Sequence, residues 1–267
     1  MLNSERYMRL LHDNAKAACR RPLVAESKGE EATLYLYDVI AGSRVEAEWF
    51  GGVCPEDFVK TLSGLTAKKI HIRINSPGGS VFGGRAIEAA IRAHGAEIIG
   101  HVDGYAASAA SFVAVACSSL EMQRGAFLMI HKAWTCMCGN ANDMKDTAEF
   151  LEKVDGTLAE TYAQKCGKPK EEMAAMMEAE TWLTAEEALE IGLADSIENA
   201  DAKASAWDLS AYAKAPAPTS GDNISGEQAD DHGVKAPVAD ESEDNRGRYE
   251  RLDRLHGTKR PADSRAA

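Results

Sequence analysis

Two hydrophobic periods alternate between residues 69 and 130, and this alternation limits the possible folds more than any other feature. "KIHIRIN", residues 69–75, alternates apolar and polar residues, as a half-buried strand does. "VFGGRAIEAAIRAHG" has helical spacing and is expected to stop at Gly95. Next come a strand at "EIIGHV", a buried helix at "AASAASFVAVACSS" and short strands at "LEMQR" and "AFLMIH". Strands that alternate with helices predict an α/β domain with parallel pairing.

Segments on both sides extend this pattern. The further predicted elements are strands at "ATLYLYDVI" and "LADSI", and helices at "PEDFVKTLSGL", 140–166, "PKEEMAAMMEAE" and "TAEEALEIG". Pro169 stands where a first helical residue is expected. Thr184 precedes Glu187 by the spacing of a capping box, which fixes the start of the last helix.

The chain of 267 residues divides into three parts by composition. Residues 31–200 carry the alternating pattern and predict one folded domain, since 45% of the whole chain is hydrophobic. Residues 1–30 form an N-terminal extension with one short helix in "SERYMRLLHDNAKAA". Residues 201–267 are predicted to be a disordered tail, acidic at first and basic at its end. This charge reversal suits either an interaction tail or a merely solvated one.

Charge and hydropathy exclude several classes of protein. A net charge of -12 argues against a nucleic-acid binder, which needs a basic face. The longest apolar stretch, residues 104–120, is too short and too rich in Ala and Ser to cross a bilayer, so no membrane partner is expected. The N-terminus is too charged for a secretory signal, which predicts a cytoplasmic protein.

The cysteines indicate no disulfide framework and no metal. All six are scattered and are expected to be reduced thiols. Cys136 and Cys138 lack a second Cys/His pair at the spacing of zinc ligands.

Three short motifs at the ends of predicted strands could carry chemistry. "INSPGGS", residues 74–80, is either a plain turn or a pair of backbone amides aimed at a developing oxyanion. Ser108 in "GYAASAASF" is either a helix N-cap or a nucleophile. His131 in "LMIHKA" is either a packed histidine or a general base. Glu178, Glu180 and Asp195 are the carboxylates that could orient such a base.

"INSPGGSV", "GYAASAASF", "LMIHKA" and "WLTAEEALEIGLADSI" follow one another in the order found in the proteolytic subunit of Clp protease (ClpP). Over residues 32–200 the chain resembles this family, and most closely its phage-encoded head maturation proteases. The resemblance implies a ClpP/crotonase-like fold of stacked β-β-α units with a long protruding helix.

The resemblance also implies the roles of the residues. Ser108 matches the family's nucleophile and His131 its general base. Glu180 stands where most ClpP subunits have Asp, and it is expected to orient His131, with Glu178 as the second choice. The backbone amides of Gly79 and Ala109 match the oxyanion hole.

Two further residues match positions that take no part in catalysis. Ser111 matches a small-residue packing position, and Asp195 matches a structural aspartate. No metal or organic cofactor is implied.

The function implied is that of a serine endopeptidase, most like a phage or prophage head maturation protease that cleaves scaffold or capsid proteins and its own tail. The resemblance also implies homo-oligomeric rings of seven subunits, stacked through the helix at 140–166. The alternatives are a housekeeping Clp subunit with an ATPase partner, a crotonase-fold acyl-CoA enzyme and a non-catalytic assembly protein. Docking features for an ATPase are not recognisable, and the expected location is the host cytoplasm or the assembling phage head.

Overall fold

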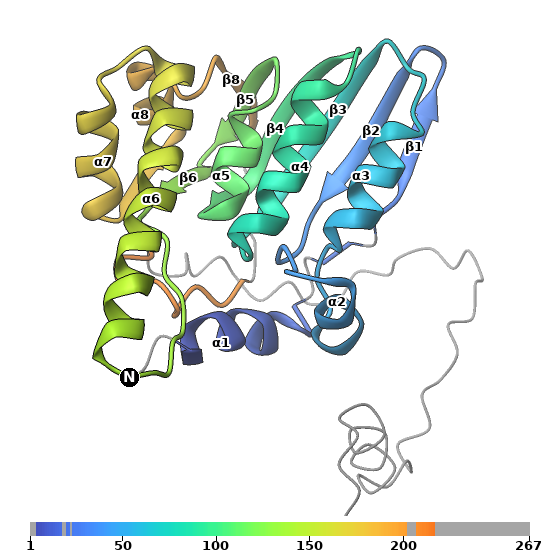
Figure 1. The fold of residues 1–267 in the computed structure, drawn as a ribbon. Helices are drawn as coiled ribbons and strands as arrows, with labels where there is room; N and C mark the ends of the chain where they lie inside the picture. Colours follow the sequence, from blue (N-terminus) through green and yellow to red (C-terminus); the bar gives the residue numbers. More distant parts are fainter. Residues whose placement is uncertain (1–3, 18–19, 22, 202–206, 217–267) are drawn as a thin grey trace, which may run out of the picture. The chain divides into compact units, whose positions relative to one another are not determined.

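The computed structural model describes residues 4–17, 20–21, 23–201 and 207–216, and one sheet of eight strands forms its centre (Figure 1). The strands are β1 (Ala25–Lys28), β2 (Glu31–Leu36), β3 (Lys69–Ser76), β4 (Glu97–Ala107), β5 (Ser119–Arg124), β6 (Phe127–Ile130), β7 (Thr181–Thr184) and β8 (Ser196–Asp201). Their order is β1-β2-β3-β4-β5-β8, with β6 paired to β4 and β7 paired to β6. Only the β1–β2 and β6–β7 pairs are antiparallel, so the expected α/β class with parallel pairing is confirmed.

Strand β4 is long enough to pair with two different strands on one side. Its first part, at Ile99–Val102, is in register with β5, and its last part, at Tyr105–Ala107, is in register with β6. Strands β3, β4 and β6 therefore run parallel, and their carboxyl ends lie at the same edge of the sheet. Such edges are where open α/β sheets bind ligands.

Helices α3, α4 and α5 lie along one face of the sheet (Figure 1). The helices are α1 (Ser4–Asn14), α2 (Arg44–Phe50), α3 (Pro55–Ser63), α4 (Val81–Ala93), α5 (Ala109–Ala114), α6 (Ala141–Cys166), α7 (Lys170–Glu178) and α8 (Ala185–Ile191). The N-terminal half of α6 extends past the ends of the strands, as expected for a long protruding helix (Figure 1). None of the helices in the described part of the chain is both long and apolar enough to cross a membrane.

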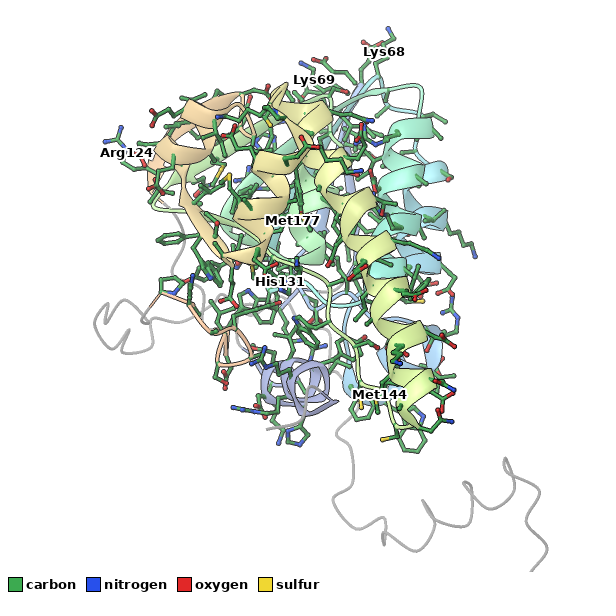
Figure 2. The ribbon with its side chains drawn as sticks, turned by 60° about the vertical axis from the view of Figure 1, so that its left-hand side comes forward. Lys68, Lys69, Arg124, His131, Met144 and Met177 are labelled. Carbon is green, nitrogen blue, oxygen red and sulfur yellow. The ribbon has the colours of Figure 1, made fainter. Side chains whose placement is uncertain are left out.

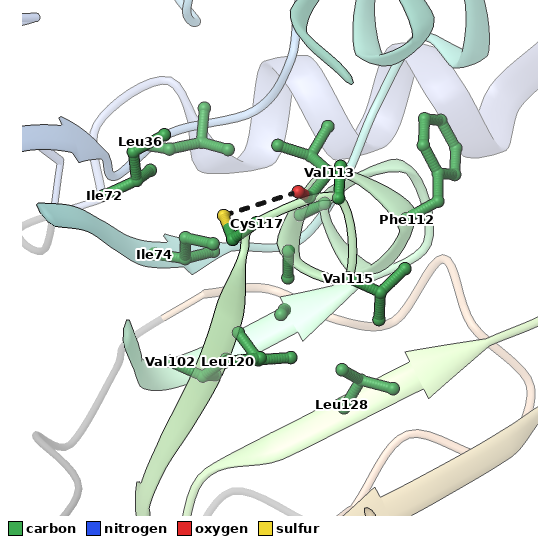
Figure 3. Packing of buried hydrophobic residues seen from close by; sticks show 14 of the residues in the cluster. Leu36, Ile72, Ile74, Val102, Phe112, Val113, Val115, Cys117, Leu120 and Leu128 are labelled. Carbon is green, nitrogen blue, oxygen red and sulfur yellow. Dashed lines mark hydrogen bonds between the residues drawn. The ribbon is translucent and has the colours of Figure 1, made fainter. Parts of the chain in front are cut away.

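The main core lies between the sheet and these helices. Successive side chains of a strand point to opposite faces, so Ile70, Ile72 and Ile74 of β3 enter the core while His71 and Arg73 lie on the other face. Figure 3 shows Ile72 and Ile74 close to α5 and Cys117, whose thiol donates to the carbonyl of Val113 at 3.9 Å. Alternation in "KIHIRIN" thus decides which residues meet the helices.

The ends of two helices follow their local sequence. Thr184 caps α8 and forms the predicted capping box with Glu187, with hydrogen bonds in both directions. Asn140 and Asp143 form a second capping box at the start of α6. Gly167 ends α6 in the left-handed conformation that glycine adopts without strain.

The structure differs from the predicted elements at several places. Strand β4 continues to Ala107, where a helix was expected from Ala106 onward, because Ala106 and Ala107 pair with β6. Helix α5 is correspondingly short. Strands β1 and β7 and helix α2 were not predicted, since four to seven residues are too few to show a clear period.

The segment 207–216 corrects the expectation of a disordered tail from residue 201 onward. Trp207, Leu209 and Tyr212 are buried and form a second hydrophobic cluster with Leu10 and Leu11 of α1. The predicted N-terminal helix is present and packs against this segment. The rest of the expected tail, 217–267, lies outside the described residues.

Candidate active site

Ser108 lies in the tight turn between β4 and α5. Its backbone has φ 53° and ψ -120°, a conformation that non-glycine residues rarely adopt. The Ser108 amide donates to the carbonyl of Met129 at 2.9 Å, which ties the turn to β6. The Ser108 side chain makes no N-cap hydrogen bond, so the N-cap interpretation is wrong. Strained backbone at a half-buried polar residue such as Ser108 is typical of functional sites.

His131 follows β6 directly and meets Ser108 across the edge of the sheet. The distance from Ser108 Oγ to His131 Nε2 is 2.6 Å, a short hydrogen bond. The pairing of Ala107 with Met129 explains this contact, because it places the residues that follow β4 and β6 side by side. The structure therefore brings together the two residues that the sequence named as nucleophile and general base.

The surroundings of His131 keep its ring neutral. Burial lowers the pKa of His131 to about 4, the carboxylate of Glu180 raises it in part, and the positive charge of Arg6 lowers it. At neutral pH the imidazole is therefore unprotonated. Its Nε2 can accept the Ser108 proton, as a general base must.

The two-glycine turn after β3 lies against Ser108. A side chain on Gly78 would meet Cβ of Ser108 at 2.7 Å and the Ala109 amide nitrogen at 3.1 Å. Gly79 has φ 141° and lies against the backbone of Ile40. The Ile40 amide donates to the Gly78 carbonyl, and the Ile40 carbonyl accepts from the Ser80 amide. The Gly79 amide takes part in neither of these hydrogen bonds, so it can donate to a ligand.

Glu180 lies close enough to affect His131 by charge but is bonded elsewhere. Its carboxylate accepts hydrogen bonds from the amides of Lys214 at 2.6 Å and Ala213 at 3.1 Å, and from Trp182 Nε1 at 3.4 Å. Among the described residues it makes no hydrogen bond to His131. The structure thus joins Ser108 to His131 but not Glu180 to His131.

The other carboxylates named from the sequence have different partners. Glu178 forms an ion pair with Lys132 at the surface. Asp195 accepts from the Leu120 amide at 2.6 Å and from Lys165 at 2.5 Å, so its role is structural, as expected.

Ser111 is a packing residue. Its hydroxyl donates to the Ser108 carbonyl at 2.6 Å and lies 2.7 Å from the Tyr162 hydroxyl of α6. It is fully buried. Of the two serines in "GYAASAASF", only Ser108 can therefore reach a substrate.

Segment 207–216 adds residues to the site that the sequence did not predict. The ring of Tyr212 lies edge-on to His131 with centroids 5.5 Å apart, and its hydroxyl donates to the Pro77 carbonyl at 2.5 Å. Trp207 Nε1 donates to Asn75 Oδ1 at 3.1 Å. The spacing of Trp207, Leu209 and Tyr212 was the available signal, since large apolar residues are unusual in a solvated tail.

A cleft of about 750 Å³ opens beside Ser108 and His131. Its walls are mostly apolar and come from α1, α4, α6, the loop after β6 and Tyr212. Phe82 and Phe150 stack across it with ring centroids 6.2 Å apart, and Trp134 lies 6.3 Å from His131 by the same measure. Figure 2 shows His131 among side chains that fill the space between the strand ends and α1. The size and mostly apolar lining of this cleft are those of a ligand-binding site.

Comparison with known families agrees with the geometry. The family model for Clp protease matches residues 55–201, which is more than half of the chain and includes Gly79, Ser108, His131 and Glu180. The chain belongs to the Clp protease family. Helix α1 and segment 207–216 lie outside the matched region.

Curated relatives of the chain are bacterial Clp proteins. The chain is 35% identical over 135 residues to the ATP-dependent Clp protease proteolytic subunit of Porphyromonas gingivalis, covering 49% of this chain and 60% of the relative. It is 31% identical over 134 residues to subunit 3 of Rhodococcus jostii, covering 49% of this chain and 65% of the relative. The alignments therefore span less than two thirds of these two relatives.

Proposed function

We propose that the chain is a serine peptidase that hydrolyses peptide bonds through Ser108 and His131. The observation that carries this proposal is the 2.6 Å hydrogen bond between Ser108 Oγ and a neutral His131 Nε2 beside the Gly78–Gly79 turn. An activated serine next to unused backbone amides is the arrangement that acyl transfer needs.

The proposed reaction begins when Ser108 Oγ attacks the peptide carbonyl carbon and its proton passes to His131 Nε2. The Gly79 and Ala109 amides stabilise the negative charge on the carbonyl oxygen. His131 then gives the proton to the leaving amine, and the acyl group stays on Ser108. Water, deprotonated by His131, releases the acid and restores the hydroxyl.

Glu180 is the proposed orienting carboxylate for His131. In the structure its charge already raises the pKa of the imidazole, although its oxygens are bonded to the Ala213 and Lys214 amides. To orient His131 during the reaction, Glu180 must give up one of these hydrogen bonds and accept one from His131 Nδ1–H instead. Glu178 is a weaker candidate because its carboxylate pairs with Lys132.

The proposed substrates are proteins, with phage or prophage head maturation as the specific role. The motif resemblance supports this role, as do the added segments α1 and 207–216, which lie outside the family match and border the cleft. A protease that acts inside an assembling shell on a few proteins has no need of an unfolding partner.

The names of these relatives favour a second role, as the proteolytic subunit of an ATP-dependent protease. Cleavage of a folded protein distinguishes the two. A requirement for ATP and a partner ATPase supports this second role, whereas cleavage of capsid or scaffold proteins without ATP supports head maturation.

Labelling with a fluorophosphonate probe, followed by mass spectrometry of the modified peptide, tests the peptidase proposal. We expect the label on Ser108 and its loss in His131→Ala. Ser111→Ala is the matched control and should retain the label on Ser108. Peptide hydrolysis that survives in Ser108→Ala contradicts the proposal.

A further inference from the structure

A second cluster of titratable side chains lies on the sheet face that carries His71 and Arg73. His101 of β4, Glu121 of β5 and Glu198 of β8 each place one potential ligand atom within 4.8 Å of the others. His101 Nδ1 is 2.6 Å from Glu198 Oε1 and 3.4 Å from Glu121 Oε2. Side chains from three neighbouring strands thus meet at one place. None of the three residues belongs to the site of Ser108 and His131.

A neighbouring histidine can accept a hydrogen bond from the ring nitrogen of His101 that points away from the carboxylates. His101 Nε2 is 2.8 Å from His71 Nδ1, and His71 Nε2 is 3.9 Å from Glu31 Oε2. With the His71 proton on Nε2, toward Glu31, His71 Nδ1 accepts from His101 Nε2–H. In this tautomer His101 Nδ1 carries the lone pair that a metal ion needs, and the bond to His71 is the kind of outer hydrogen bond that orients metal-binding histidines. Without a metal ion, the 2.6 Å contact of His101 Nδ1 with Glu198 needs a proton between the two atoms.

The carboxylates of this cluster lack a cationic partner of their own. Arg73 and Lys69, the basic side chains of β3 on this face, are bonded to Asp103 and Glu97 respectively. Among the described residues, only His101 forms an ion pair with Glu121 or Glu198. Two carboxylates that meet on a half-buried surface with one imidazole between them need a shared proton or a cation.

An unsatisfied acceptor lies beside the cluster. Gln123 is directly opposite Glu198 in the register of β5 and β8. Its side chain is buried, with the residue only 4% exposed, and its Oε1 has no hydrogen-bond partner. Acceptors thus outnumber donors at this place in the sheet.

We propose that His101, Glu121 and Glu198 bind a divalent transition-metal cation of the zinc class. Imidazole nitrogen and carboxylate oxygen are both zinc ligands, and three protein ligands leave a fourth position open for water. Ligands about 2.0–2.2 Å from a tetrahedral ion are about 3.4 Å apart. The His101–Glu121 distance already has this value, and Glu198 has to retreat by less than about 1 Å to make room.

The site joins β8 to the middle of the sheet. Strand β8 is the last strand before segment 207–216, which reaches His131 and Glu180. A cation bound here stabilises the strand that leads to that segment. Its role is structural, and it does not depend on the proposed peptidase mechanism.

Titration of the chelator-stripped full chain with zinc chloride by calorimetry tests the proposal. The parent for all measurements carries Cys136→Ser and Cys138→Ser, because these exposed thiols would bind zinc themselves. We expect one zinc ion per chain, an affinity at least about tenfold weaker in Glu121→Gln and in Glu198→Gln, and a zinc-dependent rise in melting temperature that both variants lose.

Glu97→Gln is the matched control, because Glu97 lies on β4 with His101 but is bonded to Lys69 outside the cluster. It should bind zinc like the parent. A parent that binds no zinc, or a folded Glu198→Gln variant that binds as well as the parent, overturns the proposal.

The visible spectrum of the cobalt-loaded parent decides the matter if the glutamine variants do not fold. Intense d–d bands without thiolate charge transfer support a tetrahedral His/carboxylate site. Weak octahedral bands overturn it.

Discussion

At the residue scale, Ser108 and His131 are in hydrogen-bonding contact, and both the local backbone and the burial of His131 favour this contact. The strained turn aims the hydroxyl at Nε2, and burial keeps that nitrogen free of its proton. Ser111, three residues later, is held by Tyr162 and the Ser108 carbonyl instead. Small differences of position therefore decide which of the two serines contacts His131.

The first prediction concerns the pH dependence of peptide hydrolysis. Because the pKa of His131 is about 4, kcat/KM should stay high at neutral pH and fall as the pH drops through about 4, where Nε2 becomes protonated. The Glu180 carboxylate raises this pKa, so Glu180→Gln should move the acid limb to lower pH. It should also lower kcat about a hundredfold or more.

Glu178→Gln is the control, because Glu178 has a separate partner in Lys132 and is mostly exposed. It should leave the limb and kcat unchanged. A loss of activity in Glu178→Gln with none in Glu180→Gln would transfer the orienting role to Glu178.

The second prediction concerns Gly79→Ala. A methyl group there would lie 2.2 Å from the Ile40 carbonyl oxygen, and φ 141° disfavours any side chain. The turn must shift, so the Gly79 amide loses its aim and kcat should fall about 100- to 1,000-fold. The variant should also lose about 1–3 kcal/mol of stability to unfolding by denaturant.

Gly95→Ala is the matched substitution, because no atom lies within 4 Å of its added methyl group. Its activity and stability should be close to those of the parent. Equal activity in Gly79→Ala would exclude the Gly79 amide from the oxyanion hole.

At the element scale, the sequence predicted those elements that have a clear period and enough length. The β3–α4–β4 unit and the caps of α8 follow from "KIHIRIN", "VFGGRAIEAAIRAHG" and the Thr184–Glu187 spacing. The contact of Ser108 with His131 followed from their places at strand ends. Glu180 could be identified from the sequence as a candidate. Its hydrogen bonds to the amides of Ala213 and Lys214 could not be predicted, because every residue except proline has such an amide.

The third prediction concerns these amides of segment 207–216. Lys214→Pro removes the N–H group that donates to Glu180 at 2.6 Å. One oxygen of Glu180 becomes free to accept from His131 Nδ1, so kcat should rise severalfold. The acid limb should move to higher pH, because a closer carboxylate favours the imidazolium form.

Lys214→Ala is the control, since it removes the ammonium group, which donates to the Ala179 carbonyl, but keeps the amide. Its pH profile should match that of the parent. If Lys214→Pro folds normally and loses activity, segment 207–216 supports the active site, and its amides do not keep Glu180 away from His131.

At the scale of the whole molecule, the family and the surface both favour self-association. The resemblance to ClpP implies rings that stack through the helix at 140–166, and the assembly of this chain stays a prediction. The end of α6 that extends past the sheet exposes large apolar side chains. Met144, labelled in Figure 2, is 44% exposed and Phe150 is 51% exposed, while Phe82, stacked on Phe150, is 64% exposed. Apolar side chains gathered in this way are typical of protein interfaces.

The last prediction is that the chain forms a homo-oligomer through this end of α6. Sedimentation velocity of the full chain should show a species much larger than a monomer, and Phe150→Glu should shift it to smaller species because a charge cannot be buried there. Leu189→Glu is the control, because Leu189 is 40% exposed but lies on a different helix, α8. It should leave the assembly intact.

Because Phe150 also lines the cleft, fluorophosphonate labelling of Ser108 should be measured on the same samples. Labelling that persists in a dissociated variant would show that each subunit carries a complete Ser108–His131 pair, whereas a parent that sediments as a monomer at working concentration contradicts the predicted assembly.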